Sequence, residues 1–331
     1  MIRILSIDNP NADGVSWWRN LRPLTELQRA HPDLHITFLG ENAPLHEIMA
    51  ADLVIMYRPV TPKSLGFIEQ CRVLGKKVII DIDDNLWRLP PGHPAESDYK
   101  EHAQTLHKIY AMADGIWCST DHIMDFADAR DGRGVVVANA VLPDDLPDQP
   151  APYRGIVCWR GSIVQHADIE SDEALQVFRE NADRFHRWVF WGYHPGSMRA
   201  KNADVKRRIG VVEYIVGLPQ TGINIMWKPL QENQFNDAKS NIAWIEATLA
   251  GGVCVTNYAG KPGWEWAMSE FSTEWEQLIG VWAKSREAII EHYNLERKIK
   301  RNGKFIWGGF GTFILGIFTS RLVIPEFKNP S

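Results

Sequence analysis

Cysteine and long apolar runs are both scarce in this chain. Four cysteines occur among 331 residues, and their scattered positions fit neither a metal site nor a disulfide framework: Cys71, Cys118, Cys158 and Cys254. The Gly-rich apolar run at residues 306–318 is shorter than the roughly 20 residues that cross a bilayer. These absences predict a cytoplasmic protein with reduced, buried cysteines. They also predict that the apolar run packs in a core or between domains, with membrane contact as the alternative.

The sequence signatures of common cofactor sites are missing. No G-x-G-x-x-G follows the apolar segment at residues 2–7, which disfavours a nicotinamide or flavin enzyme, and no Walker phosphate loop is present. Gly14 follows instead, and a single glycine would still let the backbone approach a ligand closely. The histidines show no H-E-x-x-H or similar metal spacing. We therefore expect no required cofactor and no metal site.

A strong excess of charge of one sign is absent as well. Lysine and arginine number 36 against 41 aspartates and glutamates, so the formal net charge is −5. This balance gives no global attraction to nucleic acid or to an acidic membrane, although a local basic groove remains compatible with it. Residues 2–7 are interrupted by Arg3 and are too short for a signal peptide. The length predicts two domains of ordinary soluble composition.

Short apolar strands alternate with amphipathic helices, which predicts an α/β protein with parallel sheets. In the first half, strands are expected at residues 2–7, 35–39, 53–57, 77–81, 115–119 and 135–138. A linker rich in proline and aspartate follows at residues 142–152. A second set of strands is expected at residues 156–159, 188–191, 211–214, 223–227 and 253–256. We therefore predict two Rossmann-like domains facing across a cleft, at residues 1–145 and 146–285, with a helix and tail at 286–331.

Residues 236–257 carry the most informative pattern. Asn236 and Asp237 suit the cap of a helix, whose first turn would contain Lys239, Ser240 and Asn241. Free backbone N–H groups in that turn would favour an anion beside the lysine. Glu246 lies two helical turns further on and can line the same side. The alternative is an ordinary capped amphipathic helix.

Three carboxylates crowd the end of the strand predicted at residues 77–81. Asp81, Asp83 and Asp84 follow one another closely, and such crowding persists in proteins when basic residues, a cation or a proton relieve it. Crowding also raises the pKa of at least one carboxyl, which would suit a general base. Asp83 and Asp84 are therefore the catalytic candidates. A hydrogen-bonded loop is the alternative.

A third candidate site opens the second domain. Arg160, Gly161 and Ser162 follow its first strand, where backbone N–H groups and a guanidinium could bind a phosphate. Lys228 ends another strand on the same edge, and Lys239 is expected nearby. The gathering of three positive side chains predicts a site for a specific anion such as a diphosphate.

These motifs resemble the GT-B glycosyltransferases, and within them the family-4-like group 1 transferases. PLQENQFNDAKSNIAWIEATLAGGVCVTN and CWRGSIVQHADIE are similar to the donor-binding segments of those enzymes, and GVSWWRNLRPLTEL and DIDDNLWRLP look like acceptor-domain motifs. The resemblance implies that Glu246 contacts the ribose of a nucleotide-sugar and that a C-terminal helix crosses back to the first domain. Ala238 stands where the family has the first of two glutamates eight residues apart, and Asp83 and Asp84 stand where it often has a histidine.

The resemblance implies a hexosyl or pentosyl transferase that moves a sugar from a nucleoside-diphosphate-sugar to an acceptor hydroxyl. The donor ligands would be Gly14, Arg160, Gly161, Ser162, Lys228, Lys239, Ser240, Asn241 and Glu246. The acceptor would contact Trp18, Arg19 and Trp87. A glycan, a lipid-linked glycan and a modified DNA base all remain open as acceptors. The alternatives are a metal-dependent transferase using Asp81 and Asp83, a nucleotide-sugar epimerase and a non-catalytic sugar- or nucleotide-binding protein.

Overall fold

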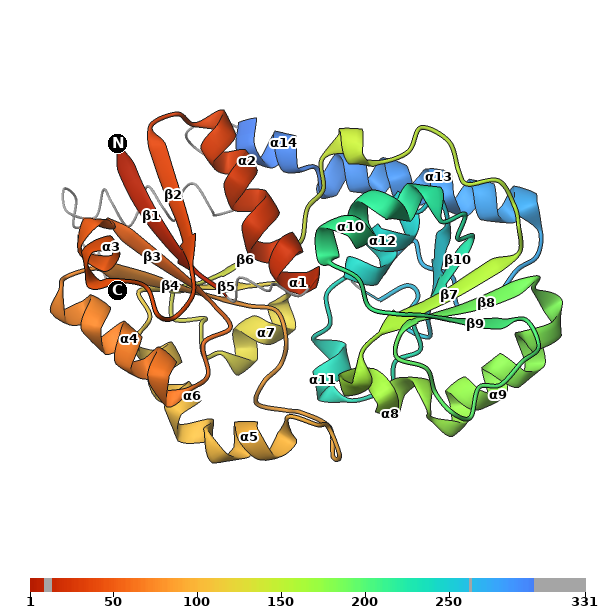
Figure 1. Cartoon of the computed structure of the whole chain (residues 1–331), viewed down its shortest axis with the longest axis horizontal. Coiled ribbons are helices and arrows are strands. Elements are labelled where there is room, and N and C mark those ends of the chain that lie inside the picture. The colour runs from red at the N-terminus through yellow and green to blue at the C-terminus, as the bar shows by residue number, and fades with distance from the viewer. Residues whose placement is uncertain (9–13, 262–263, 301–331) are drawn as a thin grey trace, which may run out of the picture.

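The computed structural model describes residues 1–8, 14–261 and 264–300, and it contains two parallel β-sheets (Figure 1). The first sheet has the order β2-β1-β3-β4-β5-β6. Its strands are β1 (Ile2–Ile7), β2 (Leu34–Leu39), β3 (Leu53–Tyr57), β4 (Lys77–Ile82), β5 (Gly115–Cys118) and β6 (Gly134–Val136). Its helices are α1 (Gly14–Ser16), a π-helical turn (Trp17–Leu21), α2 (Arg22–Ala30), α3 (Leu45–Ala50), α4 (Pro62–Val73), α5 (Glu96–Glu101), α6 (Ala103–Met112) and α7 (Asp121–Phe126). We call this unit the first domain.

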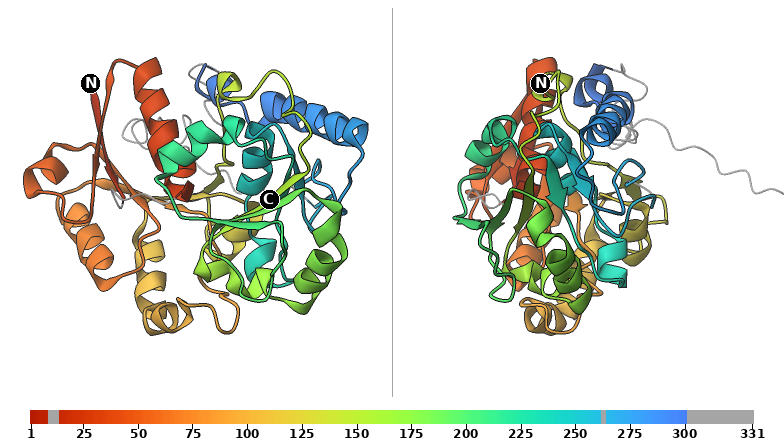
Figure 2. Two further views of the ribbon diagram at one scale, coloured as in Figure 1. Left: turned by 45° about the vertical axis from the view of Figure 1, so that its right-hand side comes forward. Right: turned by 90° about the vertical axis from the view of Figure 1, so that its right-hand side faces the viewer.

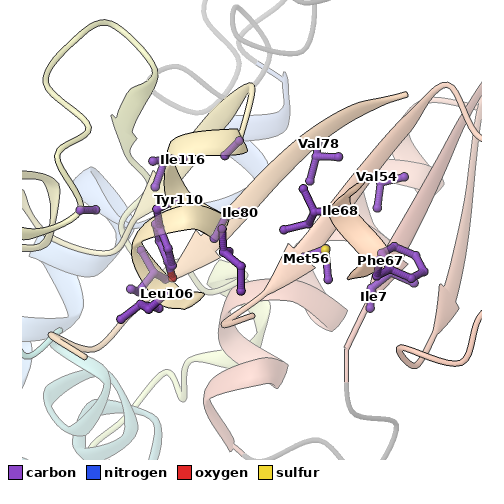
Figure 3. Packing of buried hydrophobic residues seen from close by; sticks show 14 of the residues in the cluster. Ile7, Val54, Met56, Phe67, Ile68, Val78, Ile80, Leu106, Tyr110 and Ile116 are labelled. Carbon is purple, nitrogen blue, oxygen red and sulfur yellow. The ribbon is translucent and has the colours of Figure 1, made fainter. Parts of the chain in front are cut away.

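Both faces of the first sheet are buried. Val54 of β3 packs with Phe67 of α4 in the cluster drawn in Figure 3. The neighbouring Leu53 packs on the opposite face with Leu24 of α2. Because successive side chains of a strand point to opposite faces, the continuous apolar run of β3 requires helices on both sides of the sheet.

The second sheet has the order β11-β10-β7-β8-β9 and forms the second domain. Its strands are β7 (Ile156–Gly161), β8 (Arg187–Gly192), β9 (Ala203–Lys206), β10 (Ile225–Trp227) and β11 (Val253–Val255). Its helices are α8 (His166–Ile169), α9 (Asp172–Asn181), α10 (Val211–Gly217), α11 (Gln234–Asp237), α12 (Ile242–Leu249) and α13 (Trp275–His292). Short 3-10 turns lie at Pro143–Asp145, Ile163–Gln165, Ala182–Arg184 and Leu218–Gln220.

The chain returns to the first domain after α13. Helix α14 (Leu295–Lys300) lies beside α2 in both views (Figures 1 and 2). Leu295 and Ile299 join the same hydrophobic cluster as Leu24. The Leu295 amide also donates to the carbonyl of Val141 at 2.9 Å. A late segment of the chain therefore completes the core of the first domain.

The α/β prediction and the two Rossmann-like parallel sheets are confirmed. Most predicted strands agree within a residue or two, and the predicted domain boundaries stay a prediction. None of the helices in the described ranges is both long enough and apolar enough to cross a membrane. The apolar run at residues 306–318 lies outside the described residues.

One strand prediction is wrong. Residues 211–214 lie in helix α10, although their β-branched residues favour a strand. Tyr214 and Leu218, four residues apart, are buried in the core of the second domain while Val212 and Val216 are exposed. Burial of one helical face therefore decides the structure over local preference. The edge strand β9 (Ala203–Lys206) was not predicted at all.

The helix predicted from Asn236 is also corrected. It forms as two pieces, the short α11, which begins at Gln234, and α12, which begins at Ile242. Asn233 caps α11 by accepting the amide of Asn236 at 2.9 Å. Lys239, Ser240 and Asn241 thus form a connection that leads directly into α12.

Candidate active site

The three carboxylates after β4 each have basic partners. Asp81 is buried and accepts from Arg19 at 2.5 Å. Burial raises the pKa of Asp81 to about 6 even with this guanidinium beside it. Arg19 itself is 3% exposed and also donates to the carbonyl of Val137. Both side chains are buried and paired with each other, and the acceptor contact predicted for Arg19 stays a prediction.

Arg58 holds the other two carboxylates together. Its guanidinium lies 2.5 Å from Asp83 and 2.9 Å from Asp84. Its backbone φ of 46° lies in the left-handed region that non-glycine residues rarely adopt. Arg58 follows β3, which neighbours β4 in the parallel sheet, so the two strands bring the residues to one edge. The sequence prediction missed Arg58, because nothing near it in the sequence indicates a partner 25 residues away.

Asp84 links the two domains. Its carboxylate lies 2.8 Å from the ammonium of Lys239, and both side chains are mostly buried. Burial by itself would raise the pKa of Asp84, but Lys239 and Arg58 lower it to about 2. A carboxylate with so low a pKa is a poor general base. In this arrangement it is suited to accept hydrogen bonds and to hold position.

Two further hydrogen bonds tie the same segment of the second domain to the first. Asn85 donates to the carbonyl of Gln234 at 3.1 Å, and Thr120 donates to that of Ala238 at 3.1 Å. The first domain therefore holds the backbone at both ends of α11, at Gln234 and at Ala238. Asn241 is buried at the start of α12, and its side-chain amide nitrogen has no hydrogen-bond partner among the residues that the structure describes.

Glu246 is the centre of a buried network. Its carboxylate accepts from both Nε and Nη2 of Arg160, with the Nε contact at 3.1 Å. It also accepts from the hydroxyl of Tyr214 at 3.2 Å and from the indole N–H of Trp18 at 3.3 Å. Trp18 belongs to the π-helical turn of the first domain, a local irregularity found frequently at functional sites. Arg160 is thus fixed at the contact between the domains by a glutamate that is itself fully buried.

Lys228 has a different environment. It is 9% exposed, and its side chain makes no hydrogen bond or ion pair with another residue in the described ranges. Burial, with the positive charges of Lys239 and Arg160 nearby, lowers its pKa to about 8. Three cations therefore gather at the edge of the second sheet, and one of them lacks a partner. A mostly buried ammonium of this kind is a candidate binding group for an anion.

The remaining predicted site residues vary in their surroundings. Gly161 is packed so closely that a Cβ atom would lie 2.5 Å from the Trp159 ring, whereas a Cβ at Gly14 would meet only Val211, at 3.7 Å. Ser162 precedes the 3-10 turn without a side-chain cap bond. Trp87 packs edge-on against Tyr110 in the first core, and its buried indole N–H makes no hydrogen bond within the described part of the chain.

His93 also lies at this contact, and the sequence prediction left it uninformative. Burial and the nearby Lys239 lower its pKa, and its ring lies 5.5 Å from Phe235 of α11. Asp168 accepts from the amide of Gln231 at 3.0 Å and from the side chain of Asn236 at 2.7 Å. His93 lies in the loop after β4 and Asp168 lies in helix α8, so only the folded arrangement of the two domains reveals that they are close. In the described part of the chain, no group of three metal-ligating side chains is present.

A groove of about 1340 Å³ lies beside the site. The first domain contributes residues 88–91, and the second contributes residues 229–234 together with parts of α9 and residues 269–271. The charged side chains of the lining are four glutamates and two arginines: Glu173, Glu180, Glu232, Glu270, Arg88 and Arg184.

No protein-family model and no curated protein sequence matches the chain. Solved structures do resemble it. HepE of Anabaena, solved with UDP and glucose, has a TM-score of 0.63 at 9% identity, over 97% of this chain and 100% of that one. AviGT4, a glycosyltransferase involved in avilamycin A biosynthesis, has a TM-score of 0.55 at 12% identity, over 92% and 98%.

The α,α-trehalose 6-phosphate synthase of Burkholderia multivorans gives a TM-score of 0.53 at 10% identity, over 97% of this chain and 98% of that one. Identities this low establish a shared fold. The chain therefore has the GT-B architecture, in which two Rossmann-like domains meet at the carboxyl ends of their strands.

Proposed function

We propose that the protein is a glycosyltransferase that moves a sugar from a nucleoside-diphosphate-sugar to an acceptor hydroxyl. The observation that carries this proposal is the unpartnered, buried Lys228 beside Arg160 and Lys239. A diphosphate would pair with this ammonium and would offset both the burial and the neighbouring positive charges that lower the lysine pKa. The same cations would stabilise the charge that develops on the departing diphosphate.

The other proposed donor contacts are assigned from where their residues lie in the second domain. Ser162, Ser240 and Asn241 precede short helices or turns at the same edge, and their backbone and side-chain groups would complete the diphosphate site. Glu246 would contact the ribose only by giving up part of its network with Arg160, Tyr214 and Trp18. Asp83 and Asp84 would orient the acceptor hydroxyl. HepE, of the same fold, binds UDP, which makes a uridine nucleotide the first donor to test.

The finer assignments belong to this proposal as well. We assign the protein to the family-4-like transferases, of hexosyl or pentosyl type, acting in the cytoplasm without a required metal or other cofactor. The metal-dependent alternative is less favoured, because Asp81 and Asp83 are both paired with arginines. Epimerase activity would form product without any acceptor, and a pure binding protein would show no turnover.

The groove supports an uncharged glycan as the acceptor, free or lipid-linked. Four glutamates and two arginines line it, and this negative balance would repel the phosphates of nucleic acid. Its size exceeds the range of about 300–1000 Å³ typical of small-ligand pockets. A glycan chain would therefore fit the groove better than a single small molecule.

The test is a thermal-unfolding screen of UDP, GDP, ADP and CMP, with and without Mg²⁺. A nucleotide at 100 times its dissociation constant should stabilise the wild-type protein by about 2.7 kcal/mol. Lys228→Met and Lys239→Ala should lose this stabilisation. Lys261→Ala is the matched control, since Lys261 is an exposed lysine near Asp237. The proposal fails if no nucleoside diphosphate stabilises the wild-type protein.

A further inference from the structure

Asp84 lies between two cations that belong to different domains. Lys239 of the second domain contacts one carboxylate oxygen at 2.8 Å, and Arg58 of the first domain contacts the other at 2.9 Å. The side chains of Lys239 and Asp84 are only 16% and 17% exposed. An ion pair so sheltered from water is screened less than one at the surface. The contact therefore holds the free protein in the arrangement described here.

This contact conflicts with the donor site, if the proposed function holds. Lys239 would then bind the diphosphate, whose negative charge would lie close to the Asp84 carboxylate. Two anions on one partly buried ammonium repel each other, because the low dielectric strengthens their interaction. A donor would have to weaken or displace the Asp84 contact as it binds.

Arg58 has contacts that would keep Asp84 in place while a donor replaces it on Lys239. It also lies 2.5 Å from Asp83, its amide donates to the carbonyl of Asp81 at 2.8 Å, and its guanidinium lies over the ring of Tyr57. These contacts are all within the first domain. They do not depend on Lys239 or on the position of the second domain.

We propose that Asp84 and the donor diphosphate occupy Lys239 in alternation, and that Arg58 is the positioning residue that retains Asp84 at the acceptor side after the exchange. The proposal rests on the proposed function and adds a coupling to it. Donor binding releases the carboxylate from the second domain, so that it faces the acceptor only when a donor is present.

Calorimetric titration of the whole protein with UDP tests this coupling, because the variants are expected to change UDP affinity in opposite directions. Asp84→Asn removes the competing charge and should tighten UDP binding by about fivefold, the scale of a moderately strong ion pair. Arg58→Gln leaves Asp84 to Lys239 alone and should weaken UDP binding by about threefold. The double variant should bind UDP as tightly as Asp84→Asn, because no carboxylate remains for Arg58 to hold.

Asp237→Asn is the matched control. It removes the same charge from the same segment, and Asp237 contacts Tyr258 and Lys261 instead of Lys239. UDP affinity should change less than about twofold, as expected for an exposed charge.

Three results overturn the proposal. If Asp84→Asn binds UDP no more tightly than the wild-type protein, the competition is absent while the proposed function stands. If the double variant binds as weakly as Arg58→Gln, Arg58 acts on the general structure and not through Asp84. If the wild-type protein binds none of UDP, GDP and ADP, the proposed function fails together with this inference. Should Arg58→Gln fold poorly, the Asp84→Asn titration still decides the competition.

Discussion

At the scale of single residues, the pKa of Lys228 is lowered by burial and by neighbouring positive charges. Its ammonium lies in a mostly buried position beside Arg160 and Lys239, and the resulting pKa of about 8 is below the usual value for lysine. Keeping this ammonium charged at neutral pH costs free energy relative to a lysine in water. A bound anion would offset that cost.

The pH dependence of this residue is a testable prediction. UDP affinity should fall by about tenfold between pH 7 and pH 9.5, as Lys228 loses its proton above its pKa of about 8. The free energy of unfolding should rise with pH from about 8 to about 10, because the unfolded chain then binds more protons than the folded one. Titration calorimetry and urea unfolding across this range measure both trends.

Lys228→Met provides the comparison for that prediction. It fills a similar volume without a charge, so both pH trends should disappear in it. Equal UDP affinity of the wild-type protein at pH 7 and pH 9.5 would contradict the expectation.

The sequence identified residue types at the site better than their contacts. Arg160, Lys228 and Lys239 do gather near one sheet edge, as the parallel arrangement predicted. The partners of Asp84 and Glu246 could not be predicted, because Lys239 and Trp18 reach them from the other domain, 155 and 228 residues away. Arg58 was missed for a different reason: it meets Asp83 and Asp84 within the first domain, where the order of β3 and β4 in the sheet brings them together. No local pattern encodes which side chains meet across a domain contact.

At the scale of elements, the local sequence pattern predicted a strand or helix correctly where the burial of its side chains follows the same pattern. The central strands of the first sheet, β1, β3, β4 and β5, were predicted because their apolar runs are largely buried. The split of the predicted helix at residues 238–241 was not, since Asn233 competes as a cap and the first domain holds the carbonyl of Ala238. Strand β9 has an exposed edge and mixed polarity, which gives little signal.

Helix α14 carries a prediction about stability. Leu295 is fully buried against the first domain, so Leu295→Ala should lower the free energy of unfolding by about 3 kcal/mol. Hydrogen exchange should report the loss of protection in α2 and β1. Arg297→Ala is the control, because Arg297 is exposed on the same helix and should change stability by less than about 0.5 kcal/mol. A loss confined to the second domain would show that α14 does not stabilise the first.

At the scale of the whole molecule, hydrogen bonds and ion pairs cross between the domains, and Trp18 of the first domain also packs in the hydrophobic core of the second. Trp18 to Glu246 and Asp84 to Lys239 are the charged contacts among these, and both end on residues proposed to bind the donor. Ligand binding and the relative placement of the domains are therefore linked through the same side chains.

Trp18→Phe tests this link. The substitution keeps an aromatic ring and removes the indole N–H, so the free energy of unfolding should fall by about 1.5 kcal/mol, as for a hydrogen bond to a charged group. Urea unfolding measures the change. Trp17→Phe, at the preceding position, should cost less than about 0.5 kcal/mol. Equal stability of the Trp18 variant and the wild-type protein would mean that this contact does not hold the domains together.

The return of α14 to the first domain has a consequence for biosynthesis. Leu295 and Ile299 fill a core whose strands end at Val136. During synthesis from the N-terminus, that core stays incomplete until nearly 300 residues have left the ribosome. The nascent first domain would expose an apolar face meanwhile, and such faces are the usual targets of chaperones. Production of this protein should consequently depend on chaperone supply more than its final stability suggests.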